Sequence, residues 1–119
     1  MDIVLTSIHS VCIAEIVSEH IELYDAQSAL DLLATCGYQG SEHIIIPASC
    51  ISPDFFDLKT GLAGDILQKF STYRVRLAIV GDFSAYTSKS LKDFIYESNK
   101  TGRINFVSTI EEARNTLSR

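Results

Sequence analysis

The chain has 119 residues, a net charge of −5 and an apolar fraction of 46%. This length fits one domain, which can bury a core without disulfides or metal. Acidic residues are spread along the chain and no basic face is evident, which argues against a nucleic-acid partner. No apolar run approaches the ~18 residues of a membrane span, and the N-terminus lacks a signal-peptide pattern. We therefore expect a cytosolic protein that contacts neither membranes nor nucleic acid.

The cysteines and histidines form neither a disulfide pattern nor a metal pattern. The three cysteines are an odd number at wide spacing, which predicts reduced thiols. Cys50 falls in a predicted loop and is the one thiol whose position favours reactivity. The three histidines are far apart, and none lies at metal-ligand spacing. We expect no metal and no cofactor.

The N-terminal residues predict an antiparallel β-hairpin. Residues 3–8 and 11–17 are β-branched runs separated by the polar pair His9-Ser10. This pair lacks the Asn-Gly or Asp-Gly that favours a tight hairpin turn. An exposed hairpin edge also offers a second copy of the chain a strand to pair with, so a homodimer is one of our hypotheses.

A helix and a short buried strand are predicted next. Asp25 is placed to cap a helix whose apolar residues recur at three- and four-residue steps as far as Cys36. We expect Gly37 to end this helix in the left-handed conformation. Residues 43–46 form an apolar strand, and Pro47 ends it because proline has no N–H to donate to the ladder.

The next stretch predicts a short helical turn, a bend and a longer helix. Ser52 is a helix-capping residue, and Pro53 follows it at the first helical position. Gly61 and Gly64 interrupt the helical segment that begins there, so we expect a bend. A second apolar stripe then follows and ends near Thr72.

A central strand is predicted at residues 75–80, which are apolar except for Arg76. Such a run, closed by Gly81-Asp82, is typical of a strand buried on both faces. Arg76 lies at the start of the strand, away from the presumed functional end, and we expect it to be solvated.

Two further helices and one strand complete the chain. Either Ser88 or Ser90 caps the third helix, and Ser90 with Asp93 has a weak capping-box spacing. That helix ends within residues 99–102, and residues 104–107 form the last strand. Thr109 and Glu112 have the full capping-box spacing before a short final helix.

The predicted order is therefore ββαβαβαβα in an α/β fold. Right-handed crossovers give a mixed, mostly parallel sheet of about five strands, covered by about four helices. The loops that follow the third and fourth strands lie at strand carboxyl ends, where open α/β sheets usually bind ligands.

Three segments together resemble the bacterial domain-of-unknown-function 4180 family. They are Phe55-Phe56-Asp57-Leu58-Lys59-Thr60-Gly61, then Arg76-Leu77-Ala78-Ile79-Val80-Gly81-Asp82-Phe83, then residues 88–99. The resemblance runs over nearly the whole chain. It implies a small cytosolic bacterial protein without an agreed biochemical role.

The element order is also similar to that of STAS domains, the anti-sigma-factor antagonist fold. Those domains carry an Asp-Ser-Ser-Gly-Leu motif where the helix after the third strand begins. Residues 57–62 of this chain look similar to that motif but are one residue longer. Aligned on Gly61-Leu62, the position of the phosphorylated serine holds Lys59, with the hydroxyl of Thr60 beside it. The resemblance implies the STAS architecture, and the departure removes the serine of the phospho-switch.

The loop at residues 82–89 is the first candidate site. Its hydroxyls, the free amides of the following helix and Lys89 are groups that hold a phosphate or carboxylate. The loop lacks the glycine-rich cradle of a phosphate loop. In the alternative interpretation, Thr87, Ser88 and Ser90 only cap the helix and Lys89 is solvated.

Acidic and aromatic residues give two more candidates. If Asp54, Asp57 and Asp82 cluster, they offer a cation site or a general base. They serve equally well as helix-start acids. Of Phe55 and Phe56, adjacent on a helical turn, one enters the core and the other lines a groove, unless the segment wedges both inside.

We expect a non-enzymatic binding or regulatory module that recognises a protein partner or a small anionic ligand. A small hydrolase or lyase using these acids with Tyr86 is the alternative. We assign no catalytic residue. The candidate binding residues follow the third and fourth strands: Ser52, Asp54, Phe55, Phe56, Asp57, Lys59, Thr60, Asp82, Phe83, Ser84, Tyr86, Thr87, Ser88 and Lys89.

Overall fold

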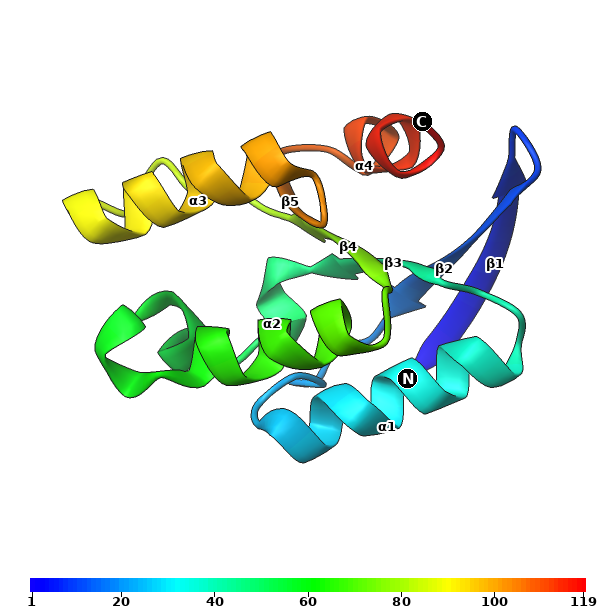
Figure 1. The fold of residues 1–119 in the computed structure, drawn as a ribbon, viewed down its shortest axis with the longest axis horizontal. Helices are drawn as coiled ribbons and strands as arrows, with labels where there is room; N and C mark the ends of the chain where they lie inside the picture. The colour runs from blue at the N-terminus through cyan, green and yellow to red at the C-terminus, as the bar shows by residue number, and fades with distance from the viewer.

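The computed structural model describes residues 1–119 and contains one five-stranded sheet with the strand order β1-β2-β3-β4-β5. The first two strands, β1 (Asp2–Ile8) and β2 (Val11–Val17), form the predicted antiparallel hairpin. The next three, β3 (His43–Pro47), β4 (Arg76–Val80) and β5 (Ile104–Val107), continue parallel to β2 (Figure 1). The predicted order ββαβαβαβα is confirmed.

Four helices cover the sheet: α1 (Ala26–Tyr38), α2 (Leu62–Thr72), α3 (Lys89–Thr101) and α4 (Ile110–Leu117). The strands advance in one direction across the sheet, so right-handed crossovers place α1, α2 and α3 on the same face. A core of 23 buried residues lies under these three helices, and six buried residues lie under α4 on the other face. None of these helices is both long enough and apolar enough to cross a membrane.

The hairpin turn has two residues in the left-handed region, with φ of 50° at His9 and 67° at Ser10. Two positive φ angles in a two-residue loop give the twist that suits a hairpin, although Gly and Asn usually occupy such positions. The turn therefore has the usual backbone geometry of a two-residue hairpin, although His and Ser are less common at these positions than Gly and Asn.

The predicted end of α1 is wrong. Gly37 lies inside the helix, Gln39 is the C-cap and Gly40 is the left-handed residue, with φ of 87°. The N–H of Ser41 donates to the Cys36 carbonyl and closes this end at 3.0 Å. The left-handed residue is needed where the chain turns toward β3, and that turn comes three residues later than the predicted Gly37.

The starts of the last two helices differ in part from the prediction. Ser88, rather than Ser90, caps α3 by accepting from the Leu91 N–H at 3.3 Å. Thr109 caps α4 by accepting from the Glu112 N–H at 3.1 Å. The Glu112 carboxylate, however, accepts from the N–H and hydroxyl of Ser108, so the reciprocal half of the predicted capping box is absent.

All three cysteines are free. Burial raises the pKa of the Cys36 thiol to about 11. The Cys50 side chain is also buried, and this burial raises the pKa of its thiol. A buried, protonated thiol is a poor nucleophile, so Cys50 is a packing residue rather than the reactive residue that its loop position favoured.

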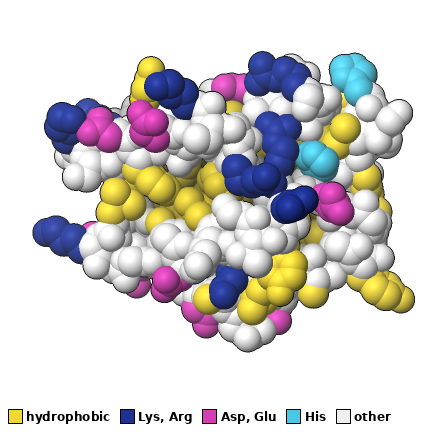
Figure 2. Space-filling view, viewed as in Figure 1, with side chains coloured by type: hydrophobic (Ala, Val, Ile, Leu, Met, Phe, Trp, Pro, Cys, Tyr) yellow, Lys and Arg dark blue, Asp and Glu magenta, His cyan; other side chains and the backbone are white.

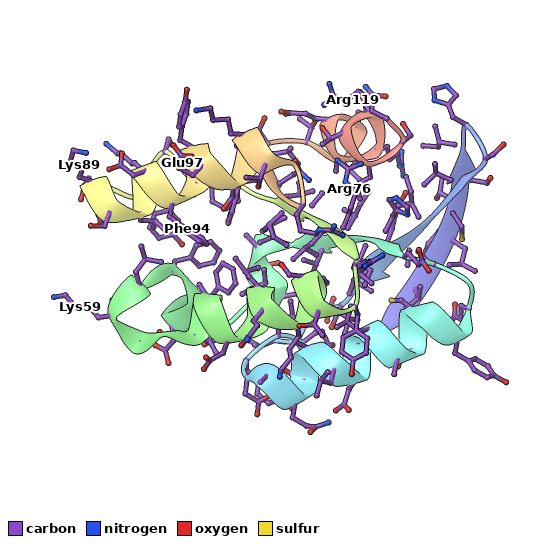
Figure 3. The ribbon with its side chains drawn as sticks, in the orientation of Figure 1. Lys59, Arg76, Lys89, Phe94, Glu97 and Arg119 are labelled. Atoms are coloured by element: carbon purple, nitrogen blue, oxygen red, sulfur yellow. The ribbon has the colours of Figure 1, made fainter.

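Arg76 is not solvated as predicted. Its guanidinium donates to the Gly102 carbonyl at 3.0 Å and to the carbonyls of Leu117 and Arg119 at 3.5 and 3.3 Å. Figure 3 shows it between the ends of α3 and α4. Burial and the neighbouring Arg103 and Arg119 lower the pKa of Arg76. One cation therefore satisfies carbonyls at two helix C-termini, where positive charge is favourable.

An ion pair fixes α4 on its face of the sheet. Glu15 on β2 accepts from Arg114 on α4 at 2.7 and 2.8 Å, in a two-point contact. The Glu15 side chain is 6% exposed and the Arg114 side chain is 35% exposed. Hydrogen bonds from Arg114, the largest effect, lower the pKa of the Glu15 carboxyl against the opposing effect of burial.

Replacing Arg114 with Ala should lower the free energy of unfolding by roughly 2–3 kcal/mol. The loss is smaller than for a fully buried pair because Arg114 is 35% exposed. Since the fold lowers the pKa of Glu15, its contribution is present above the unfolded value of ~4.3 and is lost as pH falls through the folded value. Urea unfolding at about pH 7 and about pH 3.5 measures both effects.

The double variant Glu15→Gln/Arg114→Met is the control, because it removes both charges together. Its stability should depend less on pH over this range than that of the wild type. If Arg114→Ala has the same free energy of unfolding as the wild type near neutral pH, the pair does not have the assigned role.

Candidate functional site

Two segments leave the carboxyl ends of β3 and β4 and form the rim of the sheet. The first contains the 3₁₀ turns η1 (Ala48–Cys50), η2 (Pro53–Phe56) and η3 (Leu58–Thr60) and ends at Gly61, with φ of 76°. The second is the loop at residues 81–88, which runs into α3. Because β3 and β4 are parallel neighbours, the two segments start side by side.

Aromatic side chains join the two segments. The Phe56 ring stacks on the Tyr86 ring with centroids 5.1 Å apart and planes 18° apart. Phe83 lies 6.0 Å from Phe56 and makes an edge contact with Phe106 of β5 at 5.3 Å. The predicted meeting of the two segments at one rim is therefore confirmed.

Both phenylalanines of η2 are buried, Phe55 completely and Phe56 with 8% exposure. Phe55 packs between Phe56 and Phe106, with centroid distances of 5.0 and 6.5 Å. The tight turn wedges both rings between helix and sheet, which is one of the two predicted alternatives. Phe55 therefore has no surface left for a ligand or partner.

Of the two alternatives for Asp54, Asp57 and Asp82, the structure agrees with the one in which they do not form a cation site. The structure contains no group of three or more His, Cys, Asp or Glu residues placed to hold a metal ion. Asp57 accepts from the Lys59 N–H at 3.2 Å and caps η3. Asp82 accepts from the N–H and hydroxyl of Ser84, and these bonds lower the pKa of Asp82. Asp54 is exposed in the first turn of η2, whereas Asp57 and Asp82 each serve a local turn.

Most of the predicted anion-binding groups have local partners. Ser52 accepts from the Asp54 N–H at 3.3 Å, and Ser88 caps α3. The Thr60 hydroxyl donates to the Asp54 and Asp57 carbonyls at 2.7 and 2.9 Å. The ammonium of Lys89 pairs with Asp93 at 2.7 Å, both side chains being exposed. Ser84 and Thr87 are exposed on the same loop.

A groove lies between the η segment and the start of α3. It encloses about 420 Å³ and is lined by Phe56, Asp57, Leu58, Lys59, Ser88 and Ser90. Half-buried apolar side chains of the η segment, the loop at residues 81–88 and the first turns of α2 and α3 pack against the core: Leu58, Leu62, Phe83, Tyr86, Phe94 and Ile95. Figure 2 shows hydrophobic side chains exposed in a band between α3 and α2.

The arrangement of charge around the groove is visible in Figure 3. Phe94 points from α3 toward the η segment, and Lys59 and Lys89 project from opposite sides of the groove. Leu58, Ser90 and Phe94 were missed as site residues by the sequence analysis. In the sequence, Phe94 belongs to the apolar stripe of its helix, and the packing of α3 over the rim leaves its ring only half-buried.

A second hollow of about 460 Å³ lies at the opposite end of the strands, between α1 and the turn at Tyr73. Its acidic lining residues are Asp31 and Glu42, and no ion pair forms there. No site is predicted at this end from the sequence, whereas the groove lies at the rim formed by the carboxyl ends of β3 and β4. We therefore place the candidate site at the groove.

Comparisons with known proteins agree with this architecture. The family described as "Domain of unknown function (DUF4180)" matches residues 8–117. A crystal structure from Thermotoga maritima, described as a "putative anti-sigma factor antagonist", is similar over 98% of this chain and 95% of that chain. The TM-score is 0.51 and the sequence identity is 14%, so this likeness concerns the fold. No curated protein matches the sequence.

The rim depends on a close approach at Gly81, which the variant Gly81→Ala should disturb. A Cβ at Gly81 would lie 2.7 Å from the Ala48 Cβ, so the two segments would have to separate. We expect a loss of about 1–3 kcal/mol in the free energy of unfolding. Gly64→Ala is the control, because its Cβ meets nothing within 4 Å and alanine in this helix lowers the conformational entropy of the unfolded chain. It should stabilise by about 0.5–1 kcal/mol. Equal effects of both substitutions in urea unfolding would contradict the close approach.

Proposed function

Since the chain belongs to the DUF4180 family and has a STAS-like fold, we propose that it is a non-enzymatic regulatory module that binds a protein partner through the groove. The observation that carries the proposal is that the half-buried apolar side chains of Leu58 and Phe94 lie at the groove, with Lys59 and Lys89 projecting from its opposite sides. Surfaces that bind proteins typically combine aromatic anchors with a charged rim.

A protein partner fits the groove better than a small anion does. Lys89 is engaged by Asp93, and the Ser88 hydroxyl accepts from the helix start, so the loop offers few free donors. An anion would have to displace these bonds and would still contact apolar carbon on the other side. An apolar side chain of a partner could instead cover Leu58 and Phe94 and gain from removing their carbon from water.

The place of the groove in the fold also supports binding of a protein. Residues 57–59, part of the stretch that looks similar to the STAS motif, form one wall of the groove at η3. The structurally similar protein is described as a "putative anti-sigma factor antagonist", a description that implies a protein target. In this chain Lys59 stands near the position of the phosphorylated serine, so we propose binding without that switch.

The acidic hydrolase or lyase has less support. Its three carboxylates do not converge, and the Tyr86 ring stacks on Phe56 without a hydrogen bond to any of them. A general base needs to lie within hydrogen-bond reach of the group it activates. Nothing in the groove gives Asp54, Asp57 or Asp82 such a partner.

The variant Ser90→Arg tests the proposal, because Ser90 is exposed and lines the groove. A long cation there should block an apolar partner surface and weaken binding about tenfold or more, an effect of ~1.4 kcal/mol. The full chain is used to capture proteins from a bacterial lysate with quantitative mass spectrometry. Binding of each captured candidate is then measured by calorimetry.

Ser71→Arg is the matched control, because Ser71 is also exposed on a helix but lies in the last turn of α2. A partner retained by Ser71→Arg and lost by Ser90→Arg supports the proposal. A partner retained equally by both variants contradicts it. Saturable binding of inorganic phosphate at residues 82–89, with no protein captured, would favour the small-anion alternative instead.

A further inference from the structure

Strand β1 forms an uncovered edge of the sheet. β2 is the one element with which β1 makes extended contact, whereas β5 at the other edge is flanked by α3 and α4. Figure 1 shows β1 running free along one side of the molecule. An edge strand presents unpaired N–H and C=O groups that can pair with another chain.

The hairpin register shows which backbone groups of β1 point outward. Ile8 pairs with Val11 across the two-residue turn, and in such a hairpin the closing pair exchanges hydrogen bonds. Alternate residues of β1 therefore bond toward β2, starting from Ile8. The residues between them, Ile3, Leu5 and Ser7, direct their N–H and C=O groups to the free edge.

The side chains of β1 do not protect this edge. Val4 and Leu5 are 49% and 46% exposed, and Met1 beside them is also exposed. The strand DIVLTSI contains no Lys, Pro or Gly, residues that commonly block pairing at an edge. Its one charged residue is Asp2 at the start. A seven-residue edge with exposed apolar side chains is a surface suited to strand pairing.

We propose that two copies of this chain pair through antiparallel β1 strands, with the two-fold axis passing between the two Leu5 residues. In this register Ile3 of one copy faces Ser7 of the other, and Leu5 faces Leu5. All three outward-facing residues then fall in hydrogen-bonded positions, about 5.5 Å apart between Cα atoms. The result is one continuous ten-stranded sheet.

The second copy is the occupant because the edge is complementary to itself. A single two-fold register satisfies every outward group of residues 3–7 and brings the exposed Leu5 side chains together on one face. Val4 falls opposite Thr6 on the other face. Asp2 falls opposite Ile8, so no like charges face each other. The groove lies beside α3, toward the other edge of the sheet, so this inference is independent of the proposed function.

Sedimentation velocity from micromolar to sub-millimolar concentrations tests the assembly. The wild type should form a dimer, and Leu5→Lys should raise the dissociation constant about tenfold or more, because two like charges then face each other. Val17→Lys is the control, since Val17 is an exposed apolar residue of β2 and lies off the edge. Circular dichroism checks that each variant folds. A monomeric wild type, or a dimer unaffected by Leu5→Lys, overturns the proposal.

Disulfide crosslinking tests the register. The partly exposed Cys12 is first replaced by Ser, while the other two cysteines are buried. Leu5→Cys should then form a covalent dimer under mild oxidation, because the two Cα atoms lie within disulfide range. Val4→Cys should not, because Val4 faces Thr6 rather than its own copy. Equal crosslinking of the two variants, or none from Leu5→Cys, contradicts the two-fold register.

Discussion

The parallel pairing of β3 with β4 is the constraint on which the site depends. Parallel neighbours end at the same edge of the sheet, so the segments that follow them must share one rim. Gly81 allows the approach, since any side chain there would overlap Ala48. The stack of Phe56 on Tyr86 then holds the segments together away from the strands. The groove results from this pairing and from the two helices that follow the segments, α2 after the η turns and α3 after the loop at residues 81–88.

Much of the fold follows from local signals in the sequence. Asp25 and Ser88 mark helix starts because a capping oxygen is needed wherever free amides begin a helix, and both side chains make that bond. Alternating and helical apolar patterns locate all five strands and four helices. The end of α1 escaped prediction because a glycine is tolerated inside a helix, and tertiary packing decides where the chain turns.

The site was less predictable, because it depends on contacts between distant segments. Phe55 and Phe56 have equal apolar character, and their shared burial follows only from how η2 wedges beside β5. The carboxylates looked alike in the sequence, yet Asp57 and Asp82 each serve a turn of their own. Arg76 was expected in solvent, and it is held by carbonyls at two helix ends far along the chain. No local pattern encodes these partners.

The most direct test of the account is photo-crosslinking in living bacteria, with a benzophenone amino acid placed at Ser90 in the groove or at Ser71 on the last turn of α2. We predict that position 90 gives a discrete covalent adduct with a second protein and that position 71 gives none. An adduct from position 71 alone would place the partner surface elsewhere and contradict the account.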